Sequence, residues 1–89
     1  MIQENSKKLI FTLDELTEQY GTNLEEIYRR EKFQMVESLA MYLGQSERGK
    51  ARTHIITTTS TLCMRLGVEE KLALMEALIA QVRNGVWKQ

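Results

Sequence analysis

The sequence predicts an all-α protein, a compact bundle of about four helices that associates as a homodimer. Apolar residues recur every three or four positions over most of the chain, which is the spacing of helices with one apolar face. There is no Pro, and the five Gly residues fall between the periodic segments, where helices commonly end. A chain of 89 residues also has a thin core, which association with a second copy often supplements.

The first predicted helix covers residues 13–20. Thr12 precedes it, and Glu15 stands three positions after Thr12, which is the spacing of a capping box. Residues 1–11 are expected to form an extended or flexible arm before this helix. Together, residues 1–89 are expected to form a single helical domain, because one chain of this length makes one core.

The second predicted helix covers residues 24–43. Asn23 stands at its start, and Glu26 repeats the capping pattern three positions later. A carboxylate in the first turn also suits the positive end of the helix dipole. The apolar face widens toward the C-terminal end of this segment, and this end is expected to take part in dimerisation together with the last helix.

Residues 50–66 decide the fold class, because the run 53–61 is rich in β-branched residues, which favour strands. Strict alternation fails there, since Ile55 and Ile56 are adjacent and a strand would point them to opposite faces. An apolar face that includes Ile55 and Leu62 follows helical spacing instead. A helix is therefore predicted over residues 50–66, and a strand over 53–61 is the alternative that would overturn the all-α class.

The last predicted helix covers residues 68–84 and has the strongest pattern. Its apolar seam has steps of 4, 3, 4, 3 and 4 residues, as in a coiled coil. Further apolar residues lie outside the seam, and four short helices can hardly enclose a helix that is apolar on most sides. A dimer is the simplest way to cover it. The seam begins at Val68, and the predicted dimer interface consists of Leu72, Met75, Leu78, Ile79, Val82 and Val86.

Composition excludes several classes of protein. A single Cys cannot form an internal disulfide, and no apolar run reaches the roughly 18 residues of a membrane span. The net charge is zero, so the chain lacks the basic field that drives non-specific nucleic-acid binding. Residues 1–44 hold five Lys and Arg against eight Asp and Glu, whereas residues 45–89 hold seven against four. These opposite charges favour head-to-tail contact between subunits. From the single Cys and the lack of a long apolar run, we expect a cytoplasmic location without a membrane partner.

No catalytic, cofactor-binding or metal-binding residue is predicted, and the protein is not expected to be an enzyme. His54 and Cys63 are the only His and Cys, and on one helix their nine-residue separation spans about 13 Å. A nucleophile and its base need hydrogen-bond contact, and one His with one Cys offers no metal-ligand spacing. We interpret Cys63 as a small buried residue and His54 as a partly solvated residue at a helix start. The Thr hydroxyls of this helix are expected to bond back to carbonyls one turn earlier.

Three features are candidates for binding a protein partner, although a solvated turn, a solvated helix face and core packing are the simpler alternatives. The basic loop consists of Arg48, Lys50, Arg52 and His54 around Gly49. The polar stripe, spaced i, i+4, i+7 and i+11, consists of His54, Thr58, Thr61 and Arg65. The third feature is Trp87, the only Trp, a residue type that is enriched at binding hot spots.

These features favour a small regulator or adaptor that acts by protein binding, masking or bridging the surface of an unidentified protein. The alternative is a helix-turn-helix DNA-binding transcriptional regulator that uses residues 22–32 and the basic loop 48–54. Glu25 and Glu26 argue against it, because they would bring carboxylates near DNA phosphates. In that alternative the DNA-binding residues are Asn23, Arg29, Arg30 and Lys32.

Overall fold

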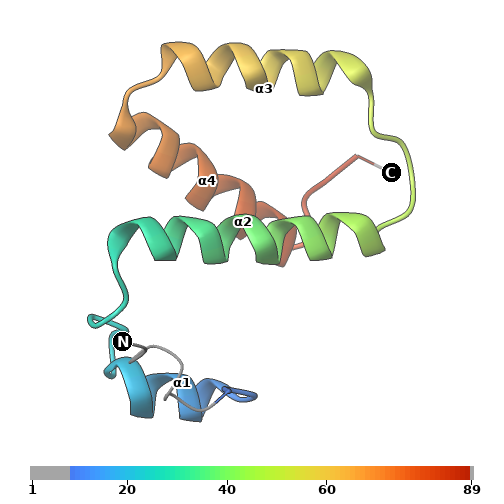
Figure 1. Ribbon diagram of the computed structural model, residues 1–89. Coiled ribbons are helices and arrows are strands. Elements are labelled where there is room, and N and C mark those ends of the chain that lie inside the picture. The colour runs from blue at the N-terminus through green and yellow to red at the C-terminus, as the bar shows by residue number, and fades with distance from the viewer. Residues whose placement is uncertain (1–8, 89) are drawn as a thin grey trace. The chain divides into compact units, whose positions relative to one another are not determined.

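The computed structural model describes residues 9–88, which form four α-helices and no strand (Figure 1). The all-α class is therefore confirmed, and the Thr-rich run 53–61 lies within a helix. Compactness is weak, because no two described residues twelve or more positions apart bring their α-carbons within 8 Å. The chain divides into unit 1, Met1–Arg48, and unit 2, Gly49–Gln89. Most of the predicted arm, residues 1–8, lies outside the described residues, and the single domain stays a prediction.

The first helix of unit 1, α1, spans Leu13–Tyr20, as the sequence predicts. Its capping box is formed in both directions. The Glu15 backbone N–H donates to Thr12 Oγ1 at 3.1 Å, and the Thr12 N–H donates to Glu15 Oε1 at 3.1 Å. Gly21 ends the helix with a φ of 104°, which a residue with a side chain rarely adopts. The exit of the chain from α1 therefore depends on glycine.

The second helix, α2, spans Arg29–Ser46 and begins five positions later than the predicted start at residue 24. Leu24 has a φ of 56°, which is left-handed and incompatible with a right-handed helix. The Asn23 N–H donates to Glu25 Oε1 at 3.0 Å, so this carboxylate holds the turn before the helix. The prediction that Asn23 and Glu26 cap the helix is wrong, because a local turn takes up these residues instead.

The start and the end of α2 each have a local polar contact. At the start, the Tyr28 N–H donates to Glu31 Oε1 at 2.9 Å, so the reaching-back carboxylate is Glu31. At the end, the Ser46 hydroxyl donates to the Leu43 carbonyl oxygen at 2.9 Å. The helix runs through Gly44, so the prediction that every Gly lies at a helix break is wrong there. One interior Gly costs a helix only about 1 kcal/mol, which neighbouring helical residues can offset.

Unit 2 contains α3, Thr53–Arg65, and α4, Val68–Arg83, and the chain reverses direction between them (Figure 1). At this reversal the Gly67 N–H donates to Glu70 Oε1 at 2.9 Å. The half-buried residues of unit 2 gather on both sides of the reversal. They are Leu62, Leu66, Lys71, Leu72 and Met75.

Helix α4 ends one residue before the predicted boundary at 84, in a Schellman motif. Gly85 has a φ of 77°, and its N–H donates to the Val82 carbonyl at 3.2 Å. The Val86 N–H donates to the Gln81 carbonyl at 2.8 Å. Val86 therefore lies beyond the helix, and the predicted helical seam stops at Val82.

Candidate protein-binding surfaces

A groove of about 510 Å³ is formed in unit 1 by side chains of α1, α2 and the connection between them. Helix α1 contributes Leu16 and Tyr20, one turn apart, and Met35 and Leu39 on α2 repeat this spacing. Ile27 comes from the connection and is buried, with 8% of its surface exposed. The lining consists of Leu16, Tyr20, Ile27, Glu31, Gln34, Met35, Ser38 and Leu39. We call this feature the α1–α2 groove.

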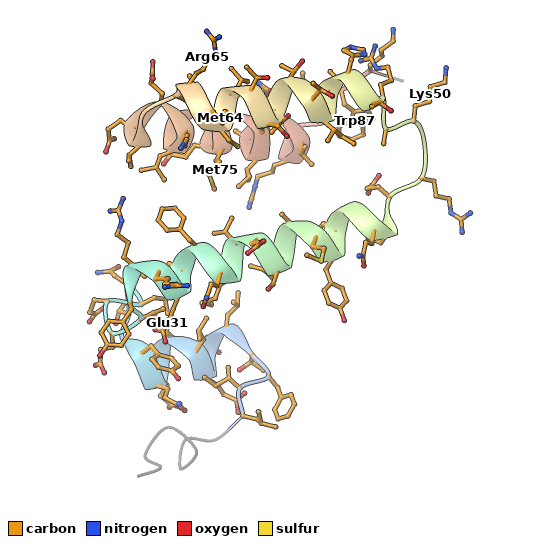
Figure 2. The ribbon with its side chains drawn as sticks, turned by 45° about the horizontal axis from the view of Figure 1, so that its top comes forward. Glu31, Lys50, Met64, Arg65, Met75 and Trp87 are labelled. Atoms are coloured by element: carbon orange, nitrogen blue, oxygen red, sulfur yellow. The ribbon has the colours of Figure 1, made fainter. Side chains whose placement is uncertain are left out.

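Among the described residues that line the α1–α2 groove, Glu31 alone is charged. Its side chain lies between the first turn of α2 and α1, as Figure 2 shows. The hydrogen bond from the Tyr28 N–H orients its carboxylate. This groove was not predicted from the sequence, although the spacing of Glu31, Met35 and Leu39 at i, i+4 and i+8 is typical of residues that share one helix face.

The predicted dimer interface on α4 is largely uncovered within the chain. Leu72 and Met75 are half-buried, near the reversal that joins α3 to α4. Farther along the helix, Ile79 is 55% exposed and Val82 is 64% exposed. Leu78 and Val86 are also exposed. The apolar face of α4 is therefore open to solvent over its C-terminal half.

The polar stripe follows one side of α3, because its residues repeat the helical spacing over Thr53–Arg65. His54, Thr58, Thr61 and Arg65 are all exposed. Figure 2 shows Arg65 near the end of α3. The structure thus brings these four residues onto one exposed helix face.

The Thr hydroxyls of α3 bond back to the helix backbone, as predicted. Thr59 Oγ1 donates to the Ile55 carbonyl at 2.8 Å. Thr61 Oγ1 donates to the Thr57 carbonyl at 3.1 Å, and Thr57 Oγ1 donates to the Thr53 carbonyl at 3.3 Å. These bonds satisfy the hydroxyl groups within the helix itself, without a partner from another segment.

His54 and Cys63 stand near opposite ends of α3 and are both exposed. The prediction that Cys63 is buried is wrong. In α3 only Leu62 is half-buried, close to the reversal before α4, and the side of the helix that carries Cys63 stays open. Among the described residues, no group of three His, Cys, Asp or Glu side chains could hold a metal ion.

The residues of the basic loop are exposed and fall in both units. Arg48 is the last residue of unit 1. Lys50 (labelled in Figure 2) and Arg52 precede α3 in unit 2. Gly49, at the boundary, has a φ of 124°. Trp87 follows α4 and is 58% exposed, so part of its ring surface remains available for contact.

The residues of the DNA-binding alternative occupy two different places in unit 1. Arg29, Arg30 and Lys32 stand in the first turns of α2 and are exposed. The guanidinium carbon of Arg29 lies 5.4 Å from the centre of the Phe33 ring, which is cation–π distance. Asn23 lies outside the helix, in a connection over residues 21–28 that is longer than the three- or four-residue turn of a helix-turn-helix.

No protein-family model matches this chain, and comparisons with curated proteins and with solved structures find no match either. None of the helices within residues 9–88 combines the length and the apolar character that crossing a membrane requires.

Proposed function

We propose that this protein is a small regulator or adaptor that acts by protein binding, and that it works as a homodimer. The single observation that carries this proposal is the exposed apolar face of α4. Burying a Val or Ile side chain stabilises an assembly by about 1.5–3 kcal/mol relative to leaving it in water. With Ile79 and Val82 more than half exposed, covering this face provides a strong driving force for association.

The partner-binding surface that we propose is the polar stripe of α3 together with the basic loop and Trp87. These residues are exposed, and they combine cationic, hydroxyl and aromatic groups. Such a surface suits a partner with an acidic patch, since Arg forms paired hydrogen bonds to carboxylates. By covering that patch, or by joining two partners through its two copies, the dimer would mask or bridge them.

The proposal is tested first by the mass of the protein in solution. Light scattering at tens of micromolar should report a dimer, whereas a monomer would contradict the association argument. Affinity purification from the native host should then recover a protein with the wild-type chain. Arg65→Glu should lose that protein, and Arg30→Glu, a matched charge reversal at an exposed residue of α2 outside the groove lining, should retain it if the stripe is the contact surface.

DNA binding is the second candidate, favoured by the exposed cluster of Arg29, Arg30 and Lys32 at the start of α2. The N-terminal turns of a recognition helix are the part that reaches base edges in the major groove. Glu31 stands among these cations and weakens their field. The charge of residues 1–48, with six Lys and Arg against nine Asp and Glu, also opposes phosphate binding. Protein binding is therefore the better supported function.

A further inference from the structure

The α1–α2 groove and the α4 seam have complementary chemistry. The groove presents two apolar ridges, one from α1 and one from α2, and, within residues 9–88, one carboxylate, that of Glu31. The α4 seam, which consists of Leu72, Met75, Ile79 and Val82, is an apolar stripe that is half-buried at its start and exposed toward its C-terminal end. Two cations and one carboxylate, Glu76, stand at its edges. Lys71 stands one turn before Met75, and Arg83 stands one turn after Ile79.

We propose that the α1–α2 groove of one copy binds α4 of a second copy. The two copies form a two-fold symmetric dimer, in which the groove of each holds α4 of the other. This inference rests on the homodimer of the proposed function and states which surfaces form it. The mode of binding is a helix laid into an apolar groove, in which side chains one turn apart serve as anchors. The seam residues would lie between the α1 ridge of Leu16 and Tyr20 and the α2 ridge of Met35 and Leu39.

The lengths of the two surfaces agree. On α2, the groove runs from Glu31 to Leu39, which is about 12 Å of helix at 1.5 Å per residue. On α4, the seam from Leu72 to Val82 spans about 15 Å by the same measure. One face of α4 therefore fills the groove along its whole length.

Charge favours this pairing over direct contact between two copies of α4. Residues 1–48 hold six Lys and Arg against nine Asp and Glu, whereas residues 49–89 hold six against three. Contact between two copies of unit 2 brings like net charges together. Head-to-tail contact brings opposite charges together and sets Glu31 against the cations beside the seam. Two-fold symmetry then forms the favourable contact twice in each dimer.

The first test maps the contact in a chain that keeps both surfaces intact. A spin label is attached to Gln81→Cys in a Cys63→Ser background, since Gln81 lies on the side of α4 opposite the seam. This chain is mixed with an isotope-labelled wild-type copy. We expect the label to broaden the backbone NMR signals of Tyr20, Ile27 and Met35, and chemical reduction of the label to restore them.

Three other outcomes would overturn the inference. If the mixture remains dimeric and broadening is confined to α4 of the isotope-labelled copy, α4 contacts α4. The proposed homodimer would then stand without the groove contact. If the groove signals broaden only in a sample whose chain has both the spin label and the isotope label, each copy binds its own α4. A monomeric mixture would contradict the proposed homodimer and this inference with it.

The second test uses complementation between two variants. Met35→Lys disables the groove and Ile79→Lys disables the seam, so each variant alone should be monomeric. Their mixture should form a heterodimer, because one intact groove and one intact seam remain. Met41→Lys is the matched control, since Met41 is exposed on α2 outside the groove lining, and it should stay dimeric. A Met35→Lys chain as dimeric as Met41→Lys would contradict the inference, and circular dichroism would verify that each variant is folded.

Discussion

The Glu15 carboxylate accepts a hydrogen bond from the Phe11 backbone N–H at 2.9 Å, beyond the capping box that it forms with Thr12. The carboxylate thus binds two backbone donors ahead of α1. The Phe11 hydrogen bond, followed by those from Thr12, holds the pKa of Glu15 below its ordinary value of 4.5, although partial desolvation opposes the shift. Glu15 therefore ties the segment before α1 to the helix.

These hydrogen bonds predict that the stability of the N-terminal end of α1 falls at acidic pH. A carboxylate with a lowered pKa in the folded state stabilises the fold above its ordinary pKa, and this contribution is lost as the pH falls through the lowered value. The Phe11 and Thr12 amide proton shifts should titrate together with an apparent pKa below 4.5. Glu15→Gln should abolish this titration, whereas Glu18→Gln on the same helix should preserve it. Titration of both amides at the ordinary value would contradict the prediction.

Gly21 and Gly44 should respond in opposite ways to replacement by Ala. Gly21 has φ 104° and ψ 154°, a region almost restricted to glycine, and an added Cβ would meet the Glu25 carboxyl group. Gly21→Ala should therefore destabilise the fold by about 1–3 kcal/mol. Gly44 lies inside α2 with open space around it, so Gly44→Ala should stabilise α2 by about 0.5–1 kcal/mol. Urea denaturation followed by circular dichroism measures both, and equal effects of one sign would contradict this account.

A charge in the α4 seam should disrupt the dimer. Ile79→Lys places an ammonium group in the apolar face, where burial without a partner is unfavourable. The dissociation constant should rise at least tenfold, which corresponds to about 1.4 kcal/mol. Glu76→Lys, on the same helix, should leave dimerisation unchanged, and sedimentation velocity at several concentrations compares the two. If both variants associate like the wild type, the seam does not form the interface.

DNA binding makes a separate prediction at the start of α2. If this helix contacts DNA, replacing both Arg29 and Arg30 with Ala should abolish a mobility shift that weakens as salt increases. The matched control is Arg83→Ala on α4, which removes one cation far along the chain and should retain the shift. The absence of any shift with the wild-type chain at low salt would eliminate this second candidate.

Local spacing was enough to predict much of the fold. Helix α1 has the predicted ends, because the contact between Thr12 and Glu15 involves residues only three positions apart. The run 53–61 is helical, as the adjacent Ile55 and Ile56 indicated. Its hydroxyls bond to carbonyls four residues earlier, so no distant residue is needed. Such contacts are encoded within one turn of helix and are therefore visible in the sequence.

The connection between α1 and α2 was decided by the tertiary structure. Asn23 with Glu26 and Tyr28 with Glu31 both have residues three positions apart, and only the second pair stands at a helix start. The choice depends on the left-handed backbone at Leu24, which no residue spacing encodes. That same turn brings Leu16 and Tyr20 to the groove shared with α2. By itself, the sequence determined that helices form and which faces are apolar, because these are local properties. The start of α2 follows from the left-handed backbone at Leu24, and the groove follows from the way in which the connection places α1 beside α2. Cys63 is exposed because no described segment covers its side of α3. Periodicity contains none of these three-dimensional relationships.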